Sequence, residues 1–308
     1  MRYLKKLGQN FLVNKKALKK ITETLEIKKG ETIIEIGAGT GNLTGEILKK
    51  TGKLIAIEKD KNLVKSLKLK FKNHPNLKII EGDVREVLPE IAKKLKNYIR
   101  SADVISLGRK PKIKISGFPP RLNYIRFTDV ISLGENDKTD VFSFSPRFNY
   151  KIVGNIPYYL TGRLLRIFQE LKNPPKLIVL TLQKEVAERI AAQAPKMNKL
   201  SAIINLWAKP KILFHLKPAD FYPAPKVSSS VIKLEVLPLK KRLKNEELII
   251  QLIKIGSHQP RKTLLNNLSR IFPKNNLKNA FYELNLGDKT RPDDLNRDLW
   301  IKLAKILS

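Results

Sequence analysis

Two kinds of segment alternate along the first 182 residues of the chain. Short segments rich in isoleucine and valine occupy residues 31–36, 53–58, 77–81, 151–155 and 176–182. Helix-like segments separate most of them, at residues 42–50, 61–72, 85–94 and 162–171. This alternation predicts an α/β fold, in which a parallel sheet carries helices on both faces.

The segments outside this region extend the prediction. Asn14 can cap a helix whose residues Leu18, Ile21 and Leu25 lie on one face. Three later segments read as strands close enough to pair as antiparallel neighbours, at residues 201–207, 212–216 and 228–235. Beyond about residue 238 only helical patterns remain, including residues 246–255 and 295–307. We therefore predict a sheet domain over residues 1–237 and a small all-helical domain over residues 238–308.

A tandem repeat interrupts the alternation. Residues 97–122 and 123–148 are identical at 14 of 26 aligned positions. Removing residues 97–148 leaves a helix-to-strand connection of ordinary length. Because solenoids need about three or more repeats for stability, we interpret the two copies as an insertion dispensable for the chemistry. A hairpin that adds an RNA or partner contact is the alternative.

The charge of the chain predicts an acidic partner. Lysine and arginine number 61 against 28 aspartates and glutamates, which gives a net charge of +33. Nucleic acid fits such a charge best. The hydrophobic content of 42% is too high for a disordered basic tail.

The sequence argues against cysteine-dependent sites, membrane-spanning helices and a signal peptide. Without cysteine, the chain has no disulfide, no thiolate zinc site and no cysteine nucleophile. No apolar run approaches about 18 residues, and lysine and asparagine occupy the start where a signal peptide is apolar. We predict a cytoplasmic protein with no metal site and no membrane partner.

A glycine-rich turn follows the first predicted strand. Gly37, Gly39 and Gly41 have the G-x-G-x-G spacing, which resembles the nucleoside-binding turn of S-adenosylmethionine-dependent methyltransferases. Glu58 ends the second strand, where a carboxylate can accept the ribose hydroxyls. After the third strand, Asp83 can accept a hydrogen bond from an adenine amino group, and Val84 offers an apolar face to the ring. Suitable groups at three successive strand ends argue against isolated surface acids.

The fourth strand ends in the most specific motif, Asn155-Ile156-Pro157-Tyr158. The Asn155 side-chain oxygen and the Ile156 carbonyl can accept the two hydrogens of an adenine amino group. Pro157 stiffens the turn, and Tyr158 can stack on the base. If this motif stood alone, we would interpret it as a turn that ends a strand, with Tyr158 in the hydrophobic core.

Together these motifs resemble the KsgA family of small-subunit ribosomal RNA adenine N6,N6-dimethyltransferases. A related resemblance is to the ribosomal RNA methyltransferases of macrolide resistance. The resemblance covers nearly the whole chain outside the insertion. Besides the glycine turn and residues 155–158, it rests on residues 7–12 (LGQNFL), 221–227 (FYPAPKV), 261–268 (RKTLLNNL) and 291–295 (RPDDL). The last two motifs favour the small-subunit enzymes, whereas residues 258–260 (HQP) depart from the more basic, aromatic family pattern.

The resemblance implies a Rossmann-like catalytic domain over residues 1–237 and a helical RNA-binding domain over residues 238–308. It implies cofactor-binding roles for Asn10, Leu12, Gly37, Gly39, Glu58, Asp83, Val84 and Asn155. The catalytic set is Asn155, Ile156, Pro157, Tyr158 and Phe221, with Tyr158 and Phe221 on the faces of the target base. The RNA-binding set is Lys226, Arg261 and Lys262.

The reaction implied is dimethylation of two adjacent adenosines in the 3′-terminal hairpin loop of small-subunit (16S-type) ribosomal RNA. The resemblance further implies S-adenosylmethionine as cofactor, a pre-small-subunit particle as partner and a monomeric state. Three alternatives stay open at this point. These are a non-catalytic ribosome-assembly factor, a large-subunit methyltransferase of the resistance type and, far less favoured, a nicotinamide oxidoreductase.

Overall fold

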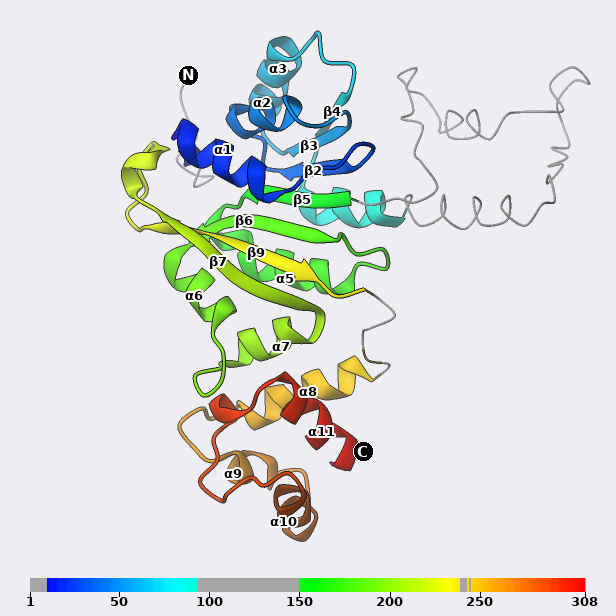
Figure 1. Cartoon of the computed structure of the whole chain (residues 1–308), viewed down its shortest axis with the longest axis vertical. Coiled ribbons are helices and arrows are strands. Elements are labelled where there is room, and N and C mark those ends of the chain that lie inside the picture. The colour runs from blue at the N-terminus through cyan, green and yellow to red at the C-terminus, as the bar shows by residue number, and fades with distance from the viewer. Residues whose placement is uncertain (1–9, 94–149, 239–242, 244, 308) are drawn as a thin grey trace, which may run out of the picture.

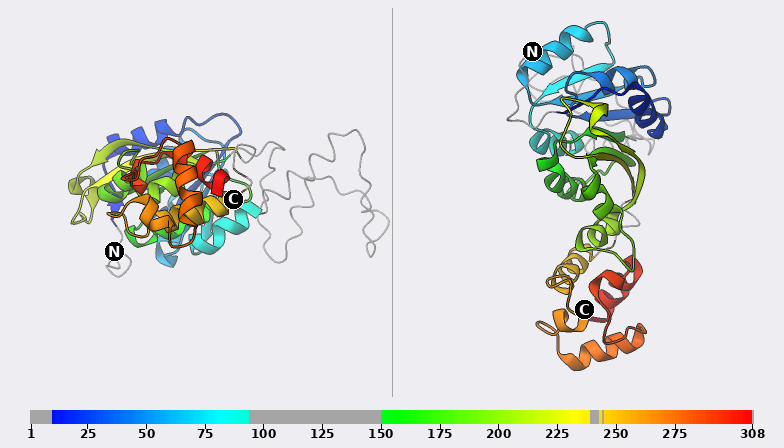
Figure 2. Two further views of the ribbon diagram at one scale, coloured as in Figure 1. Left: turned by 90° about the horizontal axis from the view of Figure 1, so that it is seen from below. Right: turned by 90° about the vertical axis from the view of Figure 1, so that its left-hand side faces the viewer.

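A computed structural model describes residues 10–93, 150–238, 243 and 245–307. The sheet and the C-terminal helices follow one another along the longest axis of the molecule (Figures 1 and 2). The repeat at residues 97–148 and the first three residues of the motif at 7–12 lie outside the described residues.

Within the described residues, the large sheet has seven strands in the order β4-β3-β2-β5-β6-β9-β7. Five of them pair in parallel: β2 (Thr32–Ile36), β3 (Leu54–Glu58), β4 (Leu77–Glu81), β5 (Tyr150–Asn155) and β6 (Leu177–Gln183). The other two, β9 (Ser229–Val236) and β7 (Ala208–Leu216), complete the sheet as antiparallel strands. The predictions of a parallel sheet and of an antiparallel pair at residues 212–216 and 228–235 are confirmed.

Helices cover both faces of this sheet (Figure 1). One face carries α1 (Lys15–Thr24), α2 (Asn42–Leu48) and α3 (Lys61–Lys70). The other face carries the helix over residues 84–93, α5 (Thr161–Glu170), α6 (Lys184–Ala191) and α7 (Lys199–Trp207). Each face of the sheet has its own hydrophobic core, and successive residues of a strand point into opposite cores. Ile33 packs in the core under α1, whereas Ile34 packs in the core on the other face. Both faces of the four central parallel strands β2, β3, β5 and β6 are therefore buried, which explains why these strands read as continuous apolar runs.

The predicted strand at residues 201–207 is wrong, because these residues belong to α7. Asn198 caps this helix by accepting hydrogen bonds from the backbone N–H groups of Leu200 and Ser201 at 2.9 and 3.1 Å. The Ser201 hydroxyl completes a capping box by accepting from the Asn198 backbone at 2.9 Å. Ile204 packs against the sheet, whereas Leu206 packs against the C-terminal helices. A helix buried on two sides lacks the polar face that identifies an amphipathic helix.

The C-terminal region is helical, as predicted from residue 238 onward. It contains α8 (Glu246–Gly256), α9 (Leu264–Leu268), α10 (Lys274–Glu283) and α11 (Arg297–Leu307). These helices surround Trp300, which is fully buried, and the same core includes Ala202 and Leu206 of α7. The boundary after residue 237 stays a prediction.

Candidate active site

The candidate site lies where the order of the parallel strands reverses direction. From β2 the chain proceeds outward to β3 and β4, and it then returns to β5 on the other side of β2. In open α/β sheets, ligands bind beyond the carboxyl ends of the strands at such a point. A cavity opens here, lined by residues that follow β2, β3, β4 and β5, and also by Asn10, Phe11 and Phe221.

The glycine turn after β2 forms one wall of this cavity. Gly37, Gly39 and Gly41 have φ angles of +70°, +57° and +77°, which are in the left-handed region. A Cβ on Gly39 would lie 2.8 Å from the ring of Phe11. The ring and the turn can thus approach this closely only because residue 39 is glycine.

Glu58, at the end of β3, is buried in the cavity wall at 7% exposure. One carboxylate oxygen accepts the backbone N–H of Gly39 at 2.9 Å. The other oxygen accepts the backbone N–H groups of Lys59 and Asp60 at 2.8 and 2.9 Å. These bonds fix the carboxylate directly beside the glycine turn.

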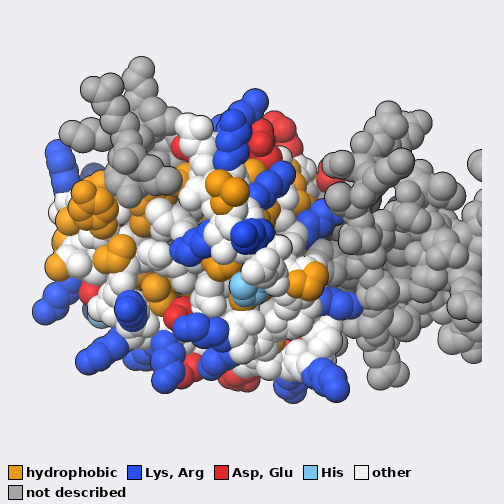
Figure 3. Space-filling model, turned by 90° about the horizontal axis from the view of Figure 1, so that it is seen from above, with side chains coloured by type: hydrophobic (Ala, Val, Ile, Leu, Met, Phe, Trp, Pro, Cys, Tyr) orange, Lys and Arg blue, Asp and Glu red, His pale blue; other side chains and the backbone are white. Residues whose placement is uncertain are grey.

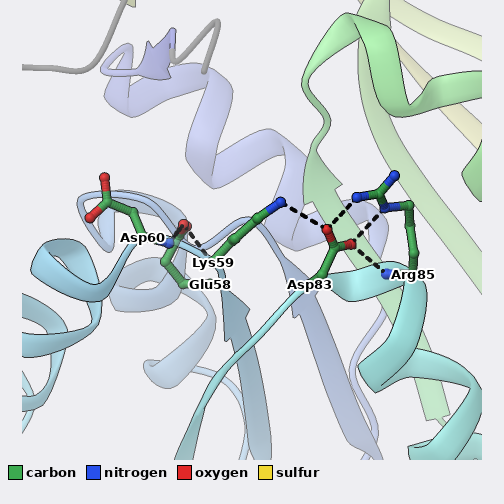
Figure 4. A network of polar contacts seen from close by, with 5 residues as sticks. All are labelled: Glu58, Lys59, Asp60, Asp83 and Arg85. Atoms are coloured by element: carbon green, nitrogen blue, oxygen red, sulfur yellow. Dashed lines mark hydrogen bonds and ion pairs between the residues drawn. The ribbon is translucent and has the colours of Figure 1, made fainter. Parts of the chain in front are cut away.

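Asp83, which follows β4, lies in a network of charged groups at the rim of the cavity (Figure 4). Lys59 Nζ donates to its carboxylate at 3.0 Å. Arg85 donates through its backbone N–H at 3.0 Å, through Nε at 2.9 Å and through Nη2 at 2.6 Å. The Arg85 guanidinium, assisted by Lys59, holds the pKa of Asp83 well below its usual range. Asp83 is therefore a fixed anion with a defined orientation.

Asn155, at the end of β5, is oriented by the N-terminal segment. Its side-chain Nδ2 donates to the backbone carbonyl of Asn10 at 2.7 Å. This bond orients the side chain, and its Oδ1 atom remains able to accept a hydrogen bond from a ligand. The next residue, Ile156, donates its backbone N–H to Thr181 on β6 at 3.2 Å, which anchors the turn.

Two aromatic residues face the same cavity from different parts of the chain. Tyr158 begins the short 3-10 helix η4 (Tyr158–Leu160), and its hydroxyl lies 3.1 Å from the Ser229 hydroxyl on β9. Phe221 belongs to β8 (Phe221–Tyr222) and is buried at 4% exposure. Its strand pairs in antiparallel fashion with β1 (Phe11–Leu12).

Further bonds hold the segment that contains β1 against the rest of the site. Asn14 Nδ2 donates to the Asp220 carboxylate at 2.6 Å, and the backbone N–H of Val13 donates to the Asp220 carbonyl at 2.9 Å. Asn42 Nδ2 donates to the Leu12 carbonyl at 3.0 Å. These contacts position Asn10 and Phe11 over the glycine turn.

A smaller cavity lies next to the main one and shares Phe11, Gly37 and Asn155 with it. Leu12 lines this smaller cavity. So does Glu35, a fully buried residue of β2 whose carboxylate accepts the Thr44 hydroxyl at 2.6 Å. Burial raises the pKa of Glu35 to about 8, so the group is mostly protonated at neutral pH.

The structure brings most of the predicted site residues together. The main cavity is lined by Asn10, Gly37, Gly39, Glu58, Asp83, Val84, Asn155, Ile156, Pro157, Tyr158 and Phe221. The three predicted RNA-binding residues are exposed outside it: Lys226 in the loop after β8, and Arg261 and Lys262 between α8 and α9. The sequence analysis missed seven residues that line the main cavity: Phe11, Ile36, Ile57, Lys59, Gly82, Tyr159 and Leu160. Phe11 could have been found, because it stands inside the motif at residues 7–12.

The glycine turn, the acidic residues at two strand ends and the Asn-Ile-Pro-Tyr turn together define a Rossmann-like methyltransferase. A family model described as "Ribosomal RNA adenine dimethylase" matches residues 2–308. The chain belongs to this family of S-adenosylmethionine-dependent enzymes, which confirms the prediction of a ribosomal RNA adenine dimethyltransferase.

Curated relatives agree with this assignment. The Mycoplasma capricolum protein named "Ribosomal RNA small subunit methyltransferase A" is 30% identical over an alignment of 311 positions, which covers 100% of this chain and 98% of the relative. A protein of the same name from Dehalococcoides mccartyi strain CBDB1 is 31% identical over 268 residues, with 86% and 74% coverage.

Two solved structures share the fold. The 23S rRNA methyltransferase ErmE superposes with a TM-score of 0.67 at 20% identity, covering 97% of this chain and 99% of ErmE. A dimethyladenosine transferase from Plasmodium falciparum gives a TM-score of 0.67 at 23% identity, with 95% coverage of both chains.

Among the described residues of our protein, no helix has the length and apolarity needed to cross a membrane.

Proposed function

We propose that this enzyme dimethylates N6 of two adjacent adenosines in the 3′-terminal hairpin loop of small-subunit ribosomal RNA, within a pre-small-subunit particle. The names of the curated relatives support the choice of the small subunit. The net charge of +33 supports a polyanionic substrate. We further propose a cytoplasmic monomer, and the absence of cysteine suits a reducing compartment.

The groups around the main cavity fit S-adenosylmethionine. The Glu58 carboxylate beside the glycine turn suits the ribose hydroxyls. The Asp83 carboxylate would accept the adenine amino group by giving up one of its bonds to Lys59 or Arg85. Val84 and Ile57 add apolar surface for a ring. When bound, the cofactor supplies an electrophilic methyl group on a sulfonium centre.

The hydrogen bond from Asn155 to the Asn10 carbonyl carries the proposed mechanism. It fixes the orientation of the Asn155 side chain, whose Oδ1 atom can then accept one hydrogen of the target amino group, and the Ile156 carbonyl can accept the other. These two bonds favour a more tetrahedral N6, whose lone pair is then less delocalised into the ring. The N6 proton becomes acidic only as the new N–C bond forms, so the site needs no strong base before attack.

Tyr158 and Phe221 would hold the target base between them. The hydrogen bond to Ser229 fixes the Tyr158 ring, and pairing with β1 fixes Phe221. Removing a loop base from its stack costs a few kcal/mol. Stacking on aromatic side chains returns about 1 to 3 kcal/mol per base.

We assign RNA-phosphate contacts to Lys226, Arg261 and Lys262, all of which are exposed. Lysine and arginine side chains are also spread over the end of the molecule that carries α2 and α3 (Figure 3). Affinity for RNA should therefore fall steeply with salt concentration.

Primer extension across the 3′ end of small-subunit RNA tests this proposal in cells with and without the gene. In cells that carry the gene we expect primer extension to stop at two adjacent positions. These stops should be absent from cells without the gene, return with a wild-type copy and stay absent with an Asn155→Ala copy. Stops that depend on the gene only in large-subunit RNA would support the resistance-type alternative. Unchanged stops together with no S-adenosylmethionine turnover on ribosomal particles would support a non-catalytic assembly factor.

A further inference from the structure

Tyr159 is an aromatic residue at the cavity for which the mechanism above has no use. It lines the main cavity, yet its side chain is 62% exposed. Its two neighbours are engaged differently, since Tyr158 contacts Ser229 and Leu160 packs against the sheet core. Tyr159 belongs to none of the buried clusters of the described residues.

The backbone of Tyr159 is nevertheless well fixed. It is the central residue of η4, and the Leu160 backbone N–H donates to the Pro157 carbonyl at 2.9 Å. The helix α5 begins directly afterwards, at Thr161, which is itself buried. The backbone that carries this large ring is thus fixed at the rim of the site, and only the side-chain torsions of Tyr159 remain to be ordered on binding.

Cationic groups stand at the same rim. Lys59 lines the cavity, and Arg85 is held beside it by Asp83. Tyr159 and Lys59 line the same cavity, and Asp83 joins Lys59 to Arg85. An exposed aromatic ring at a cavity edged by two cations suits a single-stranded nucleic acid, whose bases stack on rings while its phosphates attract cations.

We propose that Tyr159 stacks on the base next to the adenosine that occupies the cavity, and so positions the adjacent pair. This inference rests on the proposed function, because it requires a base directly beside the target. It makes Tyr159 a positioning residue for the RNA that has no contact with the reacting atoms.

A double-mutant cycle between protein and RNA tests the contact. The full-length wild-type enzyme and Tyr159→Ala are each assayed on small-subunit particles rebuilt with a synthetic 3′ RNA end. This end carries either two adenosines or one adenosine next to an abasic site. Loss of a stacked base costs about 1 to 3 kcal/mol, which corresponds to a decrease of about 5- to 150-fold in kcat/KM.

If Tyr159 stacks on the neighbour, Tyr159→Ala and the abasic site each lower kcat/KM, and the two together lower it little further than either alone. Tyr159→Phe should retain most of the activity, and affinity for S-adenosylmethionine should not change in either variant. The control is Leu69→Ala, since Leu69 is also a large exposed side chain (75%) but lies on α3, outside the cavity lining and outside residues 238–308.

The proposal would be overturned if Tyr159→Ala and the abasic site together lowered kcat/KM by the product of their separate decreases. Such independent effects would mean that the side chain and the neighbouring base make no contact with each other. A Tyr159→Ala enzyme as active as the wild type on two adenosines would also overturn it. Failure of the proposed function is a different result: the wild-type enzyme would then not methylate small-subunit particles at all.

Discussion

The buried carboxyl group of Glu35 should make the stability of this protein depend on pH. Glu35 lies in β2, the strand between β3 and β5, and its side chain is 1% exposed. Burial, assisted by the charge of Glu58 and opposed by the hydrogen bond from Thr44, raises the pKa of Glu35 from 4.5 to about 8. The folded protein therefore binds this proton more tightly than the unfolded chain does.

The sign and the size of the effect follow from proton linkage. A group whose pKa is higher in the folded state stabilises the fold fully below its unfolded pKa, and this contribution is lost as the pH rises towards the folded pKa. Between the unfolded pKa of 4.5 and the folded pKa of about 8, each unit of rising pH lowers the free energy of unfolding by about 1.4 kcal/mol. Between pH 6 and pH 8, Glu35 should thus lower the free energy of unfolding by about 2 kcal/mol.

The substitution Glu35→Gln removes the titration and preserves the shape. The glutamine carbonyl can still accept the Thr44 hydroxyl, which lies 2.6 Å from the carboxylate in the wild type. We expect the variant to resemble the wild type near pH 4 and to exceed it by about 4 kcal/mol at pH 8. Urea unfolding at pH 4, 6, 7 and 8, followed by circular dichroism, measures this difference, with Glu283→Gln on the exposed surface of α10 as control.

Parallel pH dependences for the wild type and Glu35→Gln would refute this reasoning. They would mean that Glu35 is ionised in the folded protein and that its negative charge is compensated. Parallel curves for Glu283→Gln and the wild type are expected, because that carboxyl is exposed to water.

Three other predictions concern the site and the insertion. Glu58→Ala should weaken S-adenosylmethionine binding by about 1.5 to 3 kcal/mol in calorimetry and leave RNA affinity at fixed salt unchanged, and unaltered cofactor affinity would remove Glu58 from the binding site. Asn155→Ala should lower the methylation rate more than cofactor affinity, whereas Tyr158→Phe, which loses only the contact to Ser229, should keep much of the activity that Tyr158→Ala loses. If Tyr158→Phe and Tyr158→Ala are equally inactive, the hydroxyl matters rather than the ring. Deletion of residues 97–148 should leave a folded enzyme with near-normal activity, and a folded deletion variant that binds cofactor but no longer methylates RNA would make the repeat a recognition element.

The parallel strands could be predicted from the sequence because their burial on both faces leaves a continuous apolar run. Residues 31–36 and 53–58 differ from the observed β2 and β3 by one residue at the start. The segment at residues 201–207 shows the same signal for a different reason, since α7 is buried between the sheet and the C-terminal helices. An apolar run of this length cannot distinguish the two cases, and only the cap at Asn198 marked the helix.

The side chains at the strand ends were predictable because parallel strands end at one edge of the sheet. Glu58, Asp83 and Asn155 follow directly from this rule. The pairing of Asp83 with Lys59 was not predictable, because it depends on how a loop after β3 meets the start of the helix over residues 84–93, whereas Arg85 lies only two residues from Asp83.

The pairing of β1 with β8 explains why motifs at opposite ends of the sheet domain belong to one site. Phe11 lies opposite Tyr222 in this pair, although more than 200 residues of chain separate them. Asn10, immediately before β1, accepts the hydrogen bond that orients Asn155. Phe221, in β8, faces the same cavity. The acceptor for the amino group and one of the two rings that would hold the base therefore depend on the same small sheet, so a change that breaks the β1–β8 pairing should impair both functions together.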